Sequence, residues 1–381
     1  FFNHSEGFMI IPIVFHLNSN KDLTSSGLDL KIKSDNLHFI NSVAVDYNNS
    51  PLVQANVEIS PYLDFLKKTT CSYDEESLLR HTGFRRNEED WDFDPHYGVY
   101  NKHLKFLNVD DFYSNSNTKQ VLYGSDYDKL KCINYVEKTT NDHYYYYNCF
   151  IRMKDLPFMN SMTLTRGATL KLTLTLNQLD MVFKNEAGTI TQNTIKKGHG
   201  TPFLIDNTKL ETLLSDPNDN LTIKCGVAQI GDHKHALSHV RLYSPAYTLT
   251  PLIKSQIQSS PQRKLVFNDV YINHIRRIPK GNFNYSVNNN ITRVKRLIIF
   301  PLISSNTSET TPNGNGLMGF DSLSSPFYDS APAPVNIENF NVSVSGLNVY
   351  TTNKKFKFEN YLDELDCKFG VEAGLENGMT S

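Results

Sequence analysis

Residues 162–179, MTLTRGATLKLTLTLNQL, contain the most regular pattern of the chain and decide its fold class. Within this segment, apolar and polar residues alternate from residue 170 to residue 176. Successive side chains of a β-strand point to opposite faces of the sheet, so the alternation predicts a strand with one buried face and one polar face. The buried face would carry Leu170, Leu172, Leu174 and Leu176, and the polar face Lys171, Thr173 and Thr175.

Short runs of the same kind recur along the whole chain. They are rich in the β-branched and aromatic residues that favour strands, and Asn, Ser, Gly and Pro separate them as turn formers. No regular alternation of strands and helices occurs, so a parallel α/β sheet is not expected. The sequence therefore predicts an all-β protein whose further strands cover 8–17, 28–33, 37–45, 52–59, 143–152, 221–230, 240–249, 264–273, 293–303 and 335–350.

Prolines and helical spacing modify this pattern in a few places. Pro12 interrupts the apolar run FMIIPIVFHL, and we expect it at a strand start or a sheet edge, because proline cannot donate a ladder hydrogen bond. One or two short helices are expected within 61–93. Another is expected over 251–258, where Pro251 suits a first helical turn.

The composition is that of a folded protein with a packed core. Hydrophobic residues make up 39% of the 381 residues and charged residues 20%, which excludes global disorder. The formal net charge of −2 gives no reason for the whole protein to be attracted to nucleic acid or to an acidic membrane. The five cysteines are scattered, which argues against a disulfide framework or a zinc cage and fits folding in a reducing compartment: Cys71, Cys132, Cys149, Cys225 and Cys367.

The length and the loop pattern predict two domains. Glycines and the turn signal DPND make residues 180–219 rich in loops, and we place the domain boundary there. The first domain would cover 1–200 and contain a long excursion at about 61–120. The second would cover 201–381 and contain a long loop at about 304–334.

Targeting signals are not expected. The apolar run near the N-terminus lacks a basic region and a small-residue cleavage site, and no apolar segment reaches the ~18–20 residues that cross a bilayer. Because the chain begins at Phe1, we interpret it as a fragment or a processed form. Seven N-x-S/T sequons are expected to be unmodified: Asn3, Asn48, Asn220, Asn284, Asn290, Asn306 and Asn341.

His233, His235 and His239 are the best metal-ligand candidates of the chain. On a strand the three side chains would share one face. Neither a cysteine nor a second-shell carboxylate other than Asp232 is near in the sequence, so we favour a histidine-bearing loop that leads into a strand. We therefore expect no metal ligand here.

The motifs of common enzyme sites are missing. The sequence has no G-x-S-x-G elbow, no Walker A loop and no Rossmann fingerprint. Gly314, Gly316 and Gly319 have the G-x-G-x-x-G spacing, but they follow a loop and open no helical pattern. Glu88 and Asp90 could serve a glycosidase only with a partner across a cleft. We expect no catalytic residue, no bound cofactor and no enzymatic activity.

Two basic clusters leave two interpretations open. Arg276, Arg277 and Lys280 form one, and the other consists of Arg293, Lys295 and Arg296. They could contact the phosphates of packaged DNA without reading its sequence. The interpretation we favour is that they are strand-end charges that protect sheet edges or pair with acidic neighbours.

Five segments, taken in order, resemble the double jelly-roll major capsid proteins of the Polinton-like virus, virophage and adintovirus group. They cover roughly half of the chain, and none is diagnostic alone because strand-and-turn patterns recur in many β proteins. Residues 61–120 match this family only loosely. The segments are YYYYNCFIRMKDLPFMNSMTLTRGATLKLTLTLNQ (144–178), VRLYSPAYTLTPLIKSQIQ (240–258), INHIRRIPKGNFNYSVNNNI (272–291), ITRVKRLIIFPLISS (291–305) and SPFYDSAPAPVNIENFNVSVSGLNVY (325–350).

The resemblance implies two tandem antiparallel eight-stranded jelly rolls, with short helices in the loops. It also implies a homotrimer of pseudo-hexagonal outline that tiles an icosahedral shell around a double-stranded DNA genome. The expected partners are neighbouring capsomers, penton proteins and minor or cement proteins, with possible non-specific contact with packaged DNA and no small-molecule substrate. The protein would be made and assembled inside the host cell and reside in the virion. In the family, further strands follow a segment similar to ENGMTS, so we expect the second jelly roll to be incomplete.

Two other classes of protein stay open. A carbohydrate-binding or adhesive β-sandwich protein would use the abundant Tyr and Asn for sugar stacking and hydrogen bonding. A hydrolase on a β-sandwich is the third possibility, and no sequence motif supports it.

Overall fold

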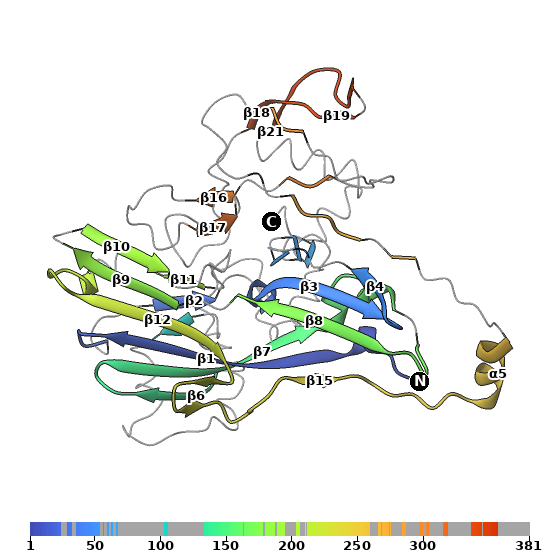
Figure 1. Cartoon of the computed structure of the whole chain (residues 1–381), viewed down its shortest axis with the longest axis horizontal. Helices are drawn as coiled ribbons and strands as arrows, with labels where there is room; N and C mark the ends of the chain where they lie inside the picture. The colour runs from blue at the N-terminus through green and yellow to red at the C-terminus, as the bar shows by residue number, and fades with distance from the viewer. Residues whose placement is uncertain are drawn as a thin grey trace, which may run out of the picture.

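The computed structural model confirms an all-β chain with few helices (Figure 1). It describes residues 1–23, 29–32, 36–53, 56, 59, 60, 62, 63, 66, 67, 103–105, 133–162, 164–177, 180–186, 189–194, 203–205, 210, 212–259, 266, 267, 269–273, 275, 284–286, 297–299, 302–304, 315–318, 337–344 and 346–356.

The largest sheet has seven strands, all antiparallel to their neighbours. Six follow the order β10-β9-β12-β1-β7-β6, and β15 also pairs with β1. The strands are β1 (Phe8–Ser19), β6 (Ile133–Lys138), β7 (Asp142–Arg152), β9 (Asp180–Glu186), β10 (Thr189–Thr194), β12 (Asn220–Val227) and β15 (Arg241–Tyr243).

β1 occupies the middle of this sheet. It pairs with β7 from Phe8 to Asn18, and on its other side first with β15 and then with β12. The apolar run predicted over 8–17 is almost continuously buried, as expected for a strand that is covered on both faces. The predicted aromatic strand 143–152 forms its neighbour β7.

We expected Pro12 at a strand start or a sheet edge, and this expectation is wrong. Pro12 lies inside β1, a central strand of the large sheet. The local geometry still explains the proline. Its carbonyl accepts a hydrogen bond from Ala228 at 2.9 Å, so its backbone faces the side shared by β12 and β15. The β15 register ends at Ile10 and the β12 register begins at Ile13. Pro12 therefore sits in the gap between two neighbours, where no ladder donor is needed.

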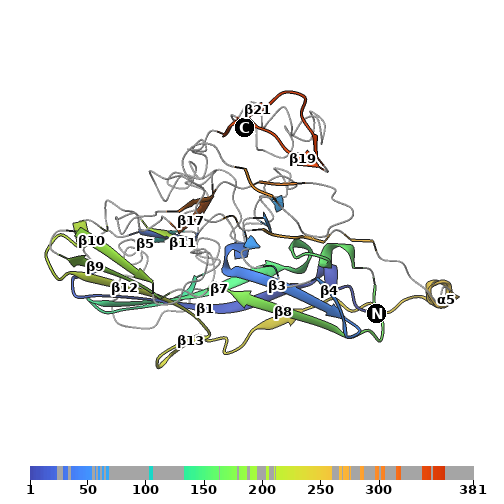
Figure 2. The same cartoon turned by 45° about the horizontal axis from the view of Figure 1, so that its top comes forward.

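A three-stranded antiparallel sheet, β4-β3-β8, packs against the large one (Figures 1 and 2). Its strands are β3 (Ile40–Tyr47), β4 (Ser50–Val53) and β8 (Leu170–Leu176). In β8 the leucines are half-buried against the core and the residues between them are exposed, which confirms the predicted alternation. Phe39, just before β3, contacts both Phe15 and Tyr147 of the large sheet, with ring centroids 6.1 Å and 6.0 Å apart. The two sheets therefore share one apolar core.

The remaining elements are short. The 3₁₀ turns are η1 (His4–Glu6), η2 (Asn36–Phe39), η6 (Met153–Asp155) and η7 (Met159–Ser161), and α5 (Pro251–Ser259) confirms the helix expected over 251–258. Within the described ranges no helix is long and apolar enough to cross a membrane. The short strands are β2 (Asp29–Ile32), β5 (His103–Lys105), β11 (Phe203–Ile205), β13 (Gln229–Ile230), β14 (His233–Lys234), β16 (Leu302–Ser304), β17 (Asn315–Met318), β18 (Ile337–Phe340), β19 (Ser343–Val344), β20 (Leu347–Asn348) and β21 (Lys354–Phe356).

Several predicted boundaries need correction. The loop-rich interpretation of 180–219 is wrong, because β9, β10 and β11 lie there. The strand expected over 37–45 begins only at Ile40, after a 3₁₀ turn. The described residues of 264–273 form no strand, and β17 lies inside the loop expected at 304–334. Most of the excursion at 61–120 lies outside the described residues; Tyr62 and Leu63 are helical.

The large sheet continues past the domain boundary that we predicted between residues 200 and 201. β12 and β15 follow that position in the sequence, yet both hydrogen-bond to β1. The boundary predicted between residues 200 and 201 therefore falls between strands of one sheet.

Candidate assembly surface

Apolar side chains are distributed unevenly along the chain. In the described part, every buried apolar residue lies between Met9 and Cys225. Apart from Phe2, all of its exposed large apolar side chains lie after residue 239. Large apolar side chains left exposed in such number, when they gather on a surface, mark interaction sites in folded proteins. We therefore treat the exposed stretch as the candidate functional site.

The stretch begins with an arm, residues 240–259, which comprises β15, a connecting segment and α5. The chain's first residues hold the connecting segment. The amide of Asn3 donates to Pro245 at 3.0 Å, and the amide of Tyr247 donates to Phe1 at 2.7 Å. The Tyr247 hydroxyl also donates to the carboxylate of Glu6, and this bond raises the pKa of the tyrosine.

Aromatic stacking fixes the base of the arm. Phe8 of β1 lies between Phe150 of β7 and Tyr243 of β15, with ring centroids 4.6 Å and 4.8 Å away. Gly7 permits this approach: a Cβ atom there would lie 2.6 Å from the carbonyl oxygen of Tyr243. The arm is therefore docked on the large sheet at its start, and its position depends on the absence of a side chain at Gly7.

The end of the arm is exposed. Figures 1 and 2 both show α5 standing apart from the sheets. Its leucine, Leu252, has 70% of its surface exposed and Ile253 has 43%. A nine-residue helix is marginal in water without packing, so this helix gains most from a partner that covers its apolar residues.

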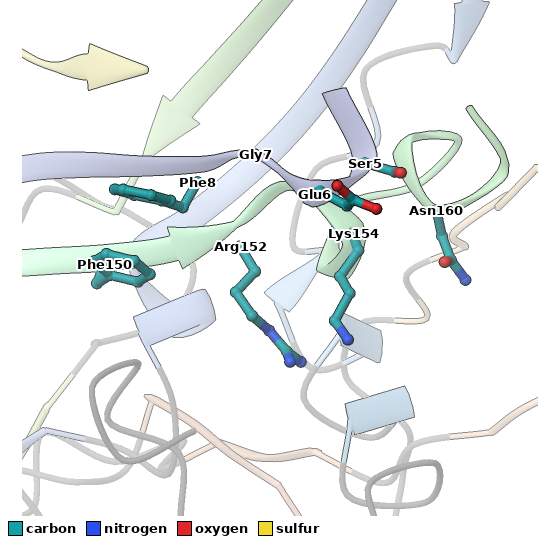
Figure 3. A pocket seen from close by; sticks show the side chains of 8 residues that line it. All are labelled: Ser5, Glu6, Gly7, Phe8, Phe150, Arg152, Lys154 and Asn160. Carbon is teal, nitrogen blue, oxygen red and sulfur yellow. The ribbon is translucent and has the colours of Figure 1, made fainter. Parts of the chain in front are cut away.

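A pocket of about 370 Å³ adjoins the base of the arm (Figure 3). The side chains of Arg152 and Lys154 line the pocket and point in the same direction, while Phe8 and Phe150 form an aromatic wall of it. Arg152 is committed elsewhere, because it makes two hydrogen bonds to Asp155, at 2.9 Å and 2.7 Å. The charge of Arg152 is therefore balanced within the protein, and this side chain is not free to bind an anion in the pocket. The other lining residues are Ser5, Glu6, Gly7 and Asn160.

Asp155 is the centre of a buried ion cluster behind this pocket. Its carboxylate lies 3.4 Å from Lys67 Nζ and 2.7 Å from Arg152. Burial alone would raise the pKa of Asp155, but the charge of Lys67 and the hydrogen bonds from Arg152 outweigh it, so the pKa is lowered. The cluster ties the residues after β7 to Lys67, near the start of the excursion.

The three histidines considered as metal ligands make different contacts. His233 stacks on Tyr144 at 3.6 Å, and His235 is buried edge-on against Tyr146 at 5.9 Å. Burial lowers the pKa of His235 to about 4, and its Nδ1 accepts a hydrogen bond from the amide of Leu237. His239 contacts the neighbouring Ser238 hydroxyl. Among the described residues no group of three or more His, Cys, Asp or Glu side chains could hold a metal ion.

Several sequence candidates lie outside the described residues. These are both basic clusters, the acidic pair Glu88 and Asp90, and two of the three glycines considered for phosphate binding; the third, Gly316, lies in β17. Conversely, sequence patterns did not reveal that residues 1–7 pair with the arm. The alternating pattern over 240–249 was the available signal, but a pattern cannot name a partner strand that lies more than 200 residues away.

No known family model, curated protein or solved structure matches this chain. The class of protein that the fold and the surface define is an all-β protein with a two-sheet core and an exposed apolar arm.

Proposed function

We propose that this chain is the major capsid protein of a double-stranded DNA virus of the Polinton-like virus, virophage and adintovirus group. In this proposal it is a structural tile and not an enzyme. Two tandem jelly rolls make up each subunit, and the second starts after β15. Three subunits form a capsomer of pseudo-hexagonal outline, which is a shape that packs into a closed shell with little distortion.

The observation that carries the proposal is the separation of buried and exposed apolar residues at about residue 239. The first part of the chain builds a rigid two-sheet body with its own core. The following part presents apolar side chains that a monomer would leave in water, at a cost of about 25 cal/mol per Å² of apolar surface. A tile requires both features, namely rigid walls and a surface that is buried only on assembly. The five sequence segments that resemble the capsid family agree with this assignment.

In the proposed capsomer the arm, residues 240–259, lies in the contact between subunits. Light scattering on the purified protein tests this. We expect a stable species of about three times the chain mass of 43.5 kDa. Leu252→Ser should weaken the trimer, because it removes the most exposed apolar side chain of α5. The matched control is Lys254→Gln on the same helix, which should leave the mass unchanged. A monomeric native protein would contradict the proposal.

A carbohydrate-binding or adhesive role is the second candidate. The exposed tyrosines Tyr243, Tyr247, Tyr271 and Tyr285 favour it, since aromatic faces can stack on sugar rings. Specific binding to a glycan array by a monomer would support this role, and the tyrosine-to-alanine variants should then lose the signal.

A further inference from the structure

Among the residues that the structure describes, strand β8 pairs with a single strand, β3. It is the last strand in the order β4-β3-β8, and β3 pairs with it along its whole length, from Leu170 to Leu176. No described strand pairs with its other side, which is therefore an open edge of the described sheet. An open edge exposes backbone donors and acceptors that can pair with another strand.

The hydrogen bonds at both ends of β8 show which backbone groups face outward. Thr169 accepts from the amide of Asn48 at 2.8 Å, and Asn177 donates to Phe39 at 2.7 Å. The N–H and C=O groups of one residue in a strand point to the same side, and the side alternates along the chain. The odd-numbered residues of β8 therefore face β3. The outward groups belong to Leu170, Leu172, Leu174 and Leu176, and in the part of the chain that the structure describes they have no partner.

This edge lacks the features that usually keep an edge strand from pairing. β8 contains no proline, and the register irregularity of the pair lies on β3, between Ile40 and Ser42. The only charge in the strand is Lys171, whose Nζ lies 3.3 Å from the carboxylate of Asp46 in the same molecule. Proteins normally block such edges with prolines, bulges or unpaired charges, so the absence of a block here calls for an explanation.

The sequence of β8, LKLTLTL, is nearly symmetric about Thr173. Two copies that run antiparallel with Thr173 opposite Thr173 place Leu172 opposite Leu174 and Leu170 opposite Leu176. All four leucines present outward backbone groups, so every one of these pairs is a hydrogen-bonded pair, and the contact would form about eight backbone hydrogen bonds.

We propose that β8 pairs with β8 of a second copy of this chain across a two-fold axis. The two sheets then join into one continuous sheet of six strands, β4-β3-β8 followed by the same strands of the second copy in reverse order. The side chains fit this register. The half-buried leucines meet leucines on the inner face, and on the outer face Lys171 meets Thr175 of the second copy, so no like charges oppose each other.

This contact is independent of the proposed capsomer, because a two-fold pair cannot close a ring of three subunits. In a shell it would join two neighbouring capsomers. The mass of the capsomer tests the proposed function, whereas the position of a β8 crosslink tests the two-fold contact. Either proposal can therefore fail while the other stands.

Cysteine crosslinking tests the register directly. Thr173→Cys places two thiols opposite each other in a non-hydrogen-bonded pair, where the Cα atoms are about 4.5 Å apart, within the range a disulfide spans. Thr175→Cys is the matched control. It is equally exposed and on the same face, but the register separates the two copies of residue 175 by four residues along the strand, or roughly 13 Å, which is too far.

Under mild oxidation of the whole chain with copper–phenanthroline, we expect Thr173→Cys to form a covalent dimer on a non-reducing gel. Thr175→Cys and the native protein should stay uncrosslinked. Equal crosslinking of the two variants, or no crosslinking of Thr173→Cys above the native level, would overturn the proposal.

Charge substitutions provide a second test that uses no cysteine. Thr175→Lys opposes Lys171 of the second copy twice in each dimer, and we expect the dissociation constant to rise about five-fold. Thr175→Glu at the same site should lower it by a similar factor. Sedimentation over a concentration series measures both constants, and two variants with equal dissociation constants would refute the register.

Discussion

Removing the negative charge of Asp155 should destabilise the protein more than any exposed charge change. Its carboxylate holds two cations, Lys67 and Arg152. The side chain of Lys67 has 4% of its surface exposed and that of Asp155 has 10%, so water cannot replace the lost partner. Asp155→Asn keeps the shape of the side chain but leaves two neighbouring cations uncompensated. Removing one partner of a buried ion pair costs about 3–5 kcal/mol, and we take about 3 kcal/mol because Arg152 is partly exposed.

A urea titration followed by circular dichroism measures this cost. With a slope of about 3 kcal/mol per molar urea, the midpoint should fall by about 1 M. The control is Asp216→Asn, whose carboxylate pairs with Lys21 at 2.5 Å but has 66% of its surface exposed. An exposed pair contributes about 0–1 kcal/mol. If Asp155→Asn costs no more than Asp216→Asn, the buried cluster does not stabilise the fold as we argue.

The cost of Asp155→Asn should also depend on pH. The folded state lowers the pKa of Asp155, so the stability that its carboxylate contributes is fully present above the unfolded pKa of about 3.9 and is lost as the pH falls through the folded pKa. The difference in unfolding free energy between the native protein and the variant should therefore be constant from pH 7 to about pH 5 and shrink below about pH 4. A difference that stays constant into acid would contradict the assigned cause.

Three further predictions concern the arm, the buried histidine and the core. Gly7→Ala should push the Tyr243 carbonyl away and loosen β15 at a cost of about 1–3 kcal/mol, which faster amide exchange in β15 with unchanged exchange in β7 would show. The pKa of His235 is about 4 against an ordinary 6.5, so the unfolded chain takes up the proton first, and stability should fall by about 3 kcal/mol as the pH drops through this range. Thermal melting of His235→Gln should show a flatter pH dependence. Tyr147→Phe removes the buried hydroxyl that donates to Asn36 at 2.5 Å, and the unfolding free energy measured in urea should fall by about 1–2 kcal/mol.

Local patterns predicted the strands whose burial follows a simple rule. β8 alternates because one of its faces is buried, and β1 is almost continuously apolar from residue 8 to residue 17 because both of its faces are covered. Both segments were found from their residues alone. The helix α5 was found in the same way, since Pro251 marks its first turn.

Sequence reasoning failed where the outcome depends on distant partners. The strand expected over 221–230 was assigned to a second domain, but β12 pairs with β1. Nothing in its sequence distinguishes a strand of a new sheet from a strand that returns to the first, because both alternate. The exposed arm could not be predicted either, since apolar residues in a sequence indicate burial without saying whether the partner is the same chain or another.

Electron microscopy of the purified protein tests the central claim most directly. The account predicts particles of three subunits with a six-lobed, pseudo-hexagonal outline, in which the arm, residues 240–259, is buried between subunits. Single, separate chains with the arm exposed at every concentration would contradict it.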